Sequence, residues 1–158
     1  MAVGDHSFEY TLPGGALATF TWPRGLDTGL DLVDLDGATA TASPAGGDPA
    51  AAVDGDGSTR WSSGAPQEPG QYLQVDLGAV HRLRRVAIDS GGHTGDYARG
   101  WTLSASTDGA GWHTLARGEG AGQLTNVDLP PTRARFLRVT STGGSGSWWS
   151  IADLRVYR

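Results

Sequence analysis

The chain has 158 residues, enough for one domain with a substantial core and a short appendage. Its 25 Gly and 8 Pro, with few long apolar runs, indicate many short strands joined by turns and exclude a mainly helical protein. The absence of Cys excludes disulfides and thiolate metal sites, and the net charge of -5 argues against nucleic acid or an anionic membrane as the main partner.

No segment approaches the length of a transmembrane span, and the first five residues lack the apolar core of a signal peptide. We therefore expect the chain to be a piece of a larger protein.

Residues 1–36 are expected to form a hairpin and a connector. Residues 7–12 and 16–22 alternate apolar with polar side chains around a Pro-Gly-Gly turn, which predicts two paired strands. A lone hairpin is marginal in water, so it should dock on the domain or belong to a neighbouring one. The segment YTLPGGALATFTW (10–22) resembles the last strands of the C-terminal β-sandwich of some clan-A glycoside hydrolases. That resemblance implies the tail of a preceding glycoside hydrolase β-sandwich, followed by a connector over 23–36.

An acidic turn follows a loop predicted over 37–50. Asp54, Gly55, Asp56 and Gly57 require a tight turn, and the carboxylates and Thr59 place several oxygen donors close together. Ca²⁺ takes about 6–8 oxygen ligands, many of them carbonyls, so the turn is a candidate calcium site. The alternative is a solvated Asx-turn without metal. Trp61, flanked by small polar residues, is predicted to anchor the turn to a core.

The rest of the chain predicts strands at the spacing of a sandwich. Alternation places Leu73, Val75 and Leu77 on one face, and the segment 101–106 repeats the pattern. No window shows a helical apolar period of helical length. The predicted strands are 72–77, 86–89, 101–106, 112–115, 124–129, 136–140 and 153–157. The expected fold is an all-β, antiparallel sandwich or barrel with long loops.

Five ordered motifs carry a family resemblance: AVDGDGSTRWSS (52–63), QYLQVDLG (71–78), SASTDGAGW (104–112), ARFLRV (134–139) and WWSIADLRVY (148–157). Together they resemble the discoidin, or coagulation factor 5/8 type C, domain, and most of all the bacterial family 32 carbohydrate-binding modules of glycoside hydrolases. The resemblance covers about residues 38–158. It implies a discoidin-like (galactose-binding-like) eight-stranded jelly-roll β-sandwich, which gives a second domain over 37–158.

The resemblance also implies one structural Ca²⁺ that ties the acidic turn to the C-terminal strand. Carried over by motif, the ligands are carbonyl oxygens of Ala51, Asp56, Thr59 and Ala152, the Asp54 and Asp153 carboxylates and the Thr59 hydroxyl. Many relatives have Glu where Asp153 stands, and the shorter side chain lengthens one bond or admits a water. The ion would fix loops and perform no chemistry.

Sugars are bound by an exposed aromatic platform and by charged or amide hydrogen-bonding groups. Trp148 and Trp149 are adjacent, and adjacent side chains of extended backbone point to opposite sides. One indole should therefore be packed and the other exposed, and we predict Trp148 as the platform. The alternative is that both indoles merely cover the end of the sandwich.

The loop between 89 and 99 is rich in polar and aromatic side chains. His93, Asp96, Tyr97 and Arg99 are predicted to line a shallow pocket, with a local Asp96–Arg99 ion pair as the alternative. Arg60 should point away from Trp61 toward the rim of this site. Asp48 and Glu68, on neighbouring loops, are secondary candidates.

The basic run 81–85 has no interleaved aromatic residues and is interpreted as a solvated face. No nucleophile elbow and no carboxylate pair in a catalytic setting occurs in the sequence. The expected function is that of a non-catalytic, monomeric carbohydrate-binding module. It would target a secreted, extracellular glycoside hydrolase to a galactosyl- or glucosyl-containing polysaccharide. The alternatives are a structural sandwich that packs on its own catalytic domain, or a lipid- or protein-binding discoidin domain.

Overall fold

The computed structural model describes residues 2–3, 6–7 and 29–158. The chain divides into two compact units, Met1–Asp31 and Leu32–Arg158. In the first unit, β1 (Ala2–Val3) pairs antiparallel with β2 (His6–Ser7). Residues 8–22 of the expected hairpin and 23–28 of the connector lie outside the described residues. The predicted relation of this segment to a preceding sandwich stays a prediction.

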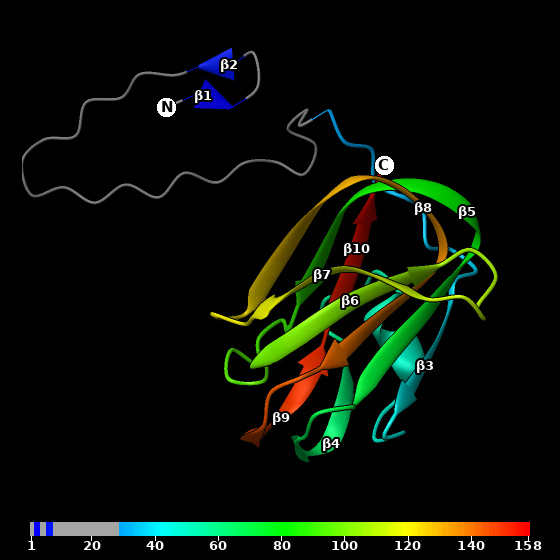
Figure 1. Cartoon of the computed structure of the whole chain (residues 1–158). Helices are drawn as coiled ribbons and strands as arrows, with labels where there is room; N and C mark the ends of the chain where they lie inside the picture. Colours follow the sequence, from blue (N-terminus) through cyan, green and yellow to red (C-terminus); the bar gives the residue numbers. More distant parts are fainter. Residues whose placement is uncertain (1, 4–5, 8–28) are drawn as a thin grey trace, which may run out of the picture. The chain divides into compact units, whose positions relative to one another are not determined.

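The described part of the second unit contains eight strands and one short 3-10 helix (Figure 1). The strands are β3 (Thr39–Ser43), β4 (Trp61–Gln67), β5 (Tyr72–Asp89), β6 (Gly100–Ser106), β7 (His113–Glu119), β8 (Leu124–Ser141), β9 (Ser145–Ile151) and β10 (Asp153–Tyr157). The helix η1 spans Pro49–Ala52. One sheet has the order β10-β5-β8-β6-β7 with β3 also paired to β5, and β4 pairs with β9 in a second sheet. All pairings are antiparallel, which confirms the predicted eight-stranded, all-β sandwich.

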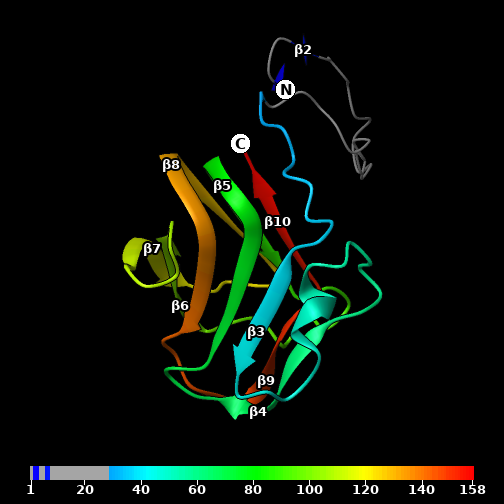
Figure 2. The ribbon, with the colours of Figure 1, turned by 90° about the vertical axis from the view of Figure 1, so that its right-hand side faces the viewer.

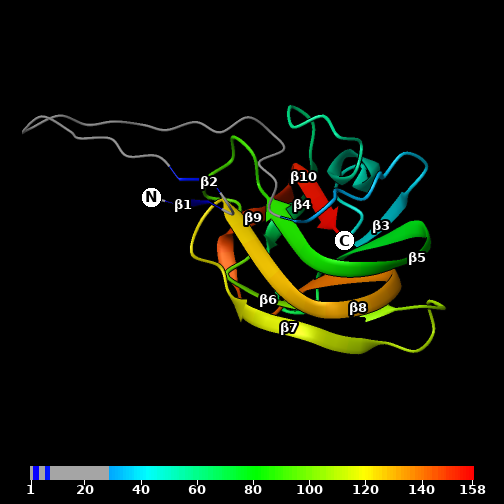
Figure 3. The same ribbon diagram turned by 90° about the horizontal axis from the view of Figure 1, so that it is seen from above.

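The long strands β5 and β8 form the centre of the larger sheet. The first part of β5 pairs with β3, and its last part pairs with β10. Between them the β5–β8 register shifts after Asp76, beside Gly78 at φ +77°, where a residue without Cβ is favoured. Figures 2 and 3 show both ribbons curving across the end of the sandwich. The sequence predicted each of these strands as two separate ones.

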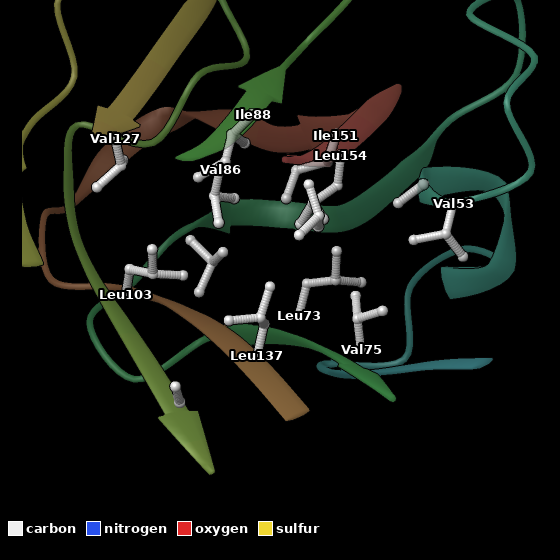
Figure 4. Packing of buried hydrophobic residues seen from close by; sticks show 14 of the residues in the cluster. Val53, Leu73, Val75, Val86, Ile88, Leu103, Val127, Leu137, Ile151 and Leu154 are labelled. Atoms are coloured by element: carbon white, nitrogen blue, oxygen red, sulfur yellow. The ribbon is translucent and has the colours of Figure 1, made fainter. Parts of the chain in front are cut away.

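The core lies between the layers and is filled by the inward residues of the strands (Figure 4). Leu73, Val75 and Leu77 are buried, as the alternation predicted. The predicted anchor, Trp61, is fully buried and packs edge-to-face on Trp149 with ring centroids 5.0 Å apart. Such pairs stabilise a core beyond the area they bury.

The predicted loop over 37–50 is wrong, because the segment contains β3 and η1. Ala40 and Ala42 pair with Val75 and Leu73 of β5, so small side chains form a strand through tertiary pairing instead of intrinsic preference. Strands β4 and β9 were not predicted either, because Ser, Gly and Pro dominate them. They pair with each other around two register shifts.

Candidate functional site

The loop between β5 and β6 folds back on itself and lies along β9. Its first turn is held by the His93 amide, which donates to the Ser90 carbonyl over 3.3 Å, and by the Asp96 amide, which donates to the His93 carbonyl over 2.9 Å. The Ser150 amide donates to the Asp96 carbonyl over 2.9 Å. The loop therefore extends the β4–β9 pair. It brings the predicted site residues between 93 and 99 next to residues 148–150 of β9.

The two adjacent tryptophans of β9 point to opposite sides. Trp149 is 1% exposed and Trp148 is 47% exposed, which is the arrangement expected for a packed indole beside a platform. Among the described residues, Trp148 is the only aromatic side chain in the group of large exposed hydrophobics. Its role in ligand binding stays a prediction.

Tyr97 and Arg99 shape the loop together. The Arg99 guanidinium carbon lies 3.8 Å from the centroid of the Tyr97 ring, and Arg99 Nη2 donates to the Gly95 carbonyl over 2.8 Å. The Asp96 carboxylate accepts a hydrogen bond from Ser150 Oγ over 3.2 Å, and the alternative Asp96–Arg99 ion pair is not formed. Arg99 covers one face of Tyr97, so that face is closed to a ligand.

His93 is exposed at the turn of the loop, where an imidazole is accessible to a ligand. A pocket behind the loop is lined by Ser90, Tyr97, Trp149 and Ser150, among others. The loop and β9 therefore enclose this hollow together with residues of β5, β6 and β8. The structure places His93, Asp96, Tyr97, Arg99 and Trp148 on these two neighbouring segments.

Arg60, Asp48 and Glu68 lie elsewhere around the site. Arg60 precedes Trp61, which pairs with Ile151, whereas Trp148 pairs with Pro66 near the other end of β4. Arg60 is half-buried. Asp48 caps η1 by accepting a hydrogen bond from the Ala50 amide over 3.0 Å, and Glu68 is exposed in the β4–β5 turn. The Asp48 side chain therefore has a local structural role.

Gln67, at the end of β4, was not among the residues predicted from the sequence. Its side chain is 2% exposed. Nε2 donates to the carbonyls of Tyr97 and Trp148, each over 2.9 Å, and Oε1 accepts from the Arg99 amide over 3.1 Å. A glutamine in an unpredicted strand carries no local signal of such a role, because all three partners are distant in sequence.

The acidic turn gathers four of the six predicted calcium-ligand residues. Thr59 Oγ1 lies 2.7 Å from Asp54 Oδ2, 2.9 Å from the Asp56 carbonyl oxygen and 3.4 Å from that of Ala51. Oxygens that share a Ca²⁺ at about 2.4 Å are separated by about 3 Å, so these distances, which are also those of hydrogen bonds, are compatible with a shared ion. The single hydroxyl proton of Thr59 faces three acceptor oxygens, two carbonyls and one carboxylate. A bound cation would balance the partial and full negative charges of these oxygens.

The Asp56 carboxylate is turned away from this cluster. Its Oδ1 accepts from both Ser58 Oγ and the Ser58 amide, and these hydrogen bonds hold the pKa of Asp56 below its usual value. The oxygen of Asp56 that lies beside Thr59 Oγ1 is its carbonyl, and its role as a Ca²⁺ ligand stays a prediction. The Asp56 amide in turn donates to Asp54 Oδ1 over 2.9 Å, so the turn also has the Asx geometry of the metal-free alternative.

The remaining two predicted ligand residues, Ala152 and Asp153, are at the start of β10. A Cβ placed on Gly91 would lie 2.7 Å from the Ala152 Cβ and 3.7 Å from the Gly57 carbonyl oxygen, so the acidic turn and Ala152 approach the same glycine. Asp153 Oδ2 lies 3.2 Å from Arg155 Nε. Within the described part of the chain, no cluster of three or more His, Cys, Asp or Glu side chains is placed to hold a metal. A calcium site here would therefore combine carbonyl oxygens and the Thr59 hydroxyl with the Asp54 carboxylate.

Comparison with known proteins places this architecture in a family. The family model described as "F5/8 type C domain" matches residues 37–154, which is most of the chain. The chain therefore belongs to the F5/8 type C domain family, and the predicted resemblance is confirmed.

Three solved structures show the same fold. The family 32 carbohydrate-binding module of C. perfringens NanJ, solved with galactose, superposes with a TM-score of 0.71 at 23% identity, covering 82% of this chain and 99% of that one. The family 32 module of AlyQ, solved with 4,5-unsaturated mannuronic acid, gives 0.64 at 30% identity, with 80% and 97% covered. Chitosan-binding module 1 from the chitosanase/glucanase of Paenibacillus sp. IK-5 gives 0.69 at 28% identity, with 81% and 99% covered.

A curated relative is much longer than this chain. The alpha-(1->3)-arabinofuranosyltransferase of Mycobacterium tuberculosis is 32% identical over 161 residues, which cover 94% of this chain and 11% of that protein. The similarity therefore concerns a small part of the transferase.

Proposed function

We propose that this chain is a non-catalytic carbohydrate-binding module whose site is formed by Trp148 and the 90–99 loop. The observation that carries the proposal is the exposed indole of Trp148 on a rigid strand, held beside a loop with His93 and Tyr97. An indole stacks on the apolar face of a sugar ring, and neighbouring polar groups bond to its hydroxyls. This function is supported by the similarity to three modules. One was solved with galactose, one was solved with a uronic acid, and the third is a chitosan-binding module.

The ligand we propose is a galactosyl- or glucosyl-containing polysaccharide. A shallow site with one platform should bind with a Kd between about 1 mM and tens of µM. Fluorescence titration of the protein with galactosyl, glucosyl, glucosaminyl and uronosyl oligosaccharides measures this directly. We expect saturable quenching by one glycan class.

The Trp148→Ala variant is expected to lose this binding while its thermal unfolding stays close to that of the wild type, because half of the indole is already in water. Trp112→Ala is the matched control. Trp112 is a half-buried indole that stacks on Arg138, at the β6–β7 turn. The proposed site would be refuted if the folded wild-type protein bound no glycan of the panel. It would also be refuted if Trp148→Ala bound the glycan as tightly as the wild type.

We also propose that the module acts within a secreted, extracellular, carbohydrate-active protein, which the sequence resemblance suggests is a glycoside hydrolase. Holding the enzyme on its polymer raises the effective substrate concentration for a linked catalytic domain. The described residues contain no helix long and apolar enough to cross a membrane. A structural Ca²⁺ in the acidic turn, with ligands from Ala51, Asp54, Asp56 and Thr59, is part of the proposal and is tested by the prediction given in the Discussion.

A further inference from the structure

We propose that Gln67 is the positioning residue of the glycan site, fixing the Trp148 platform at a set distance from the 90–99 loop. This inference rests on the proposed function and deepens it. It assigns a role to a side chain that is buried from solvent.

The amide of Gln67 joins the paired strands β4 and β9 to the 90–99 loop, which belongs to no sheet ladder with them. Its two N–H groups bond to the carbonyls of Tyr97 and Trp148, and its oxygen bonds to the Arg99 amide. Two carbonyls on one side and an N–H group on the other also fix which end of the amide is nitrogen. The platform residue and the loop are therefore bonded to the same planar group.

No other side chain satisfies these three partners. A carboxylate offers no donor and would face two carbonyl oxygens in a buried place. A methionine of similar length would leave two carbonyls and one N–H without partners, and such buried polar groups are costly. An asparagine keeps the amide but is one methylene shorter, so it can bond to only some of the three partners of Gln67.

The other loop contacts would not hold Trp148 alone. Asp96 bonds to Ser150, two residues further along β9, and Arg99 bonds to Gly95 within the loop itself. Among the residues that the structure describes, only the Gln67 amide bonds to the backbone of Trp148 and to that of the loop at once. A binding site needs its groups held to within about 0.5 Å of the productive geometry, so loss of this amide should lower affinity more than it lowers stability.

The test compares Gln67→Met with Gln71→Met. Gln71 is the control, since it is also a buried glutamine, and its Nε2 donates to the Pro66 carbonyl over 2.9 Å instead of to the 90–99 loop. Calorimetric titration with the glycan found in the panel should show at least about a tenfold rise in Kd for Gln67→Met, or about 1.4 kcal/mol. For Gln71→Met the rise should stay below about twofold, or about 0.4 kcal/mol. Gln67→Asn should fold, and its Kd for the glycan should lie between those of the wild type and Gln67→Met. The asparagine variant therefore keeps the test usable if the methionine variant unfolds.

A second readout reports on position without any ligand. In protein labelled with 5-fluorotryptophan, the Trp148 resonance is the one lost in Trp148→Phe. It should move or broaden in both Gln67 variants and stay in place in Gln71→Met. Folded Gln67 variants with unchanged affinity and an unchanged Trp148 resonance would overturn the inference. If no glycan binds even to the wild type, the proposed function fails, and the fluorine resonance alone then decides whether Gln67 positions Trp148.

Discussion

Gly91 lies where the acidic turn, the 90–99 loop and the start of β10 come together. Its φ of +63° belongs to the left-handed region, and a Cβ on it would meet the Ala152 Cβ at 2.7 Å. Its amide donates to Asp89 Oδ1 over 2.8 Å, which fixes the chain in this conformation. Both the backbone conformation and the lack of space therefore require glycine here.

We predict that Gly91→Ala lowers the free energy of unfolding by about 1–3 kcal/mol, measured by urea denaturation. Gly92→Ala is the control, because Gly92 has no positive φ and no atom within 4 Å of the added Cβ, so it should change stability by less than about 0.5 kcal/mol. Equal effects of the two substitutions would show that the crowding at Ala152 does not matter.

At the scale of elements, the β5–β8 ladder carries an unfavourable pair of charges. Arg82 and Arg133 are direct partners across the two strands, and both are exposed. The exposure of Arg82 agrees with the interpretation of the basic run 81–85 as a solvated face. The same ladder holds two favourable pairs, Arg85–Asp128 at 2.6 Å and Arg135–Asp76 at 2.7 Å. The Arg135 guanidinium holds the pKa of Asp76 below its usual value.

We predict that Arg133→Glu raises the free energy of unfolding by about 0.5 kcal/mol, because like charges directly opposite each other repel and opposite charges attract. The gain should shrink in high salt, which screens exposed charges. Arg117→Glu makes the same change of charge opposite the uncharged Thr102 and should give no such gain. If the Arg133 variant is no more stable than the Arg117 variant at low salt, the cross-strand repulsion is negligible.

At the scale of the whole molecule, the acidic turn is placed to tie distant parts of the second unit together. It follows η1, precedes β4 and approaches Gly91 and, through it, Ala152. An ion held there would stabilise the folded state alone, because the unfolded chain does not gather these oxygens.

We predict that Ca²⁺ raises the thermal unfolding midpoint and that a chelator lowers it. Ca²⁺ at about 100 times its Kd should add about 2.7 kcal/mol, measured by calorimetry. Asp54→Ala should abolish the response, whereas Asp34→Ala should keep it, because Asp34 forms the same kind of Asx-turn with the Asp36 amide in a different place. If neither Ca²⁺ nor the chelator changes the thermal unfolding midpoint, the acidic turn is a metal-free Asx-turn.

Local sequence was sufficient for features that depend on neighbouring residues. Alternation identified the inward faces of β5 and β6, because successive side chains of a strand point to opposite sides. The same rule separated Trp148 from Trp149, and Asp-Gly repeats located the tight acidic turn. The ordered motifs were sufficient to identify the family.

The tertiary structure alone decided which backbone groups pair across long separations. It made a strand of the Thr-Ala run at 39–43, paired the Ser- and Gly-rich segments β4 and β9, and joined the halves of β5 and β8 into continuous ladders. It also placed the Gln67 amide between partners 30 and 81 residues away. These features could not be predicted from the sequence, because a buried hydrogen bond depends on where the partners lie in the fold, and no local pattern records that.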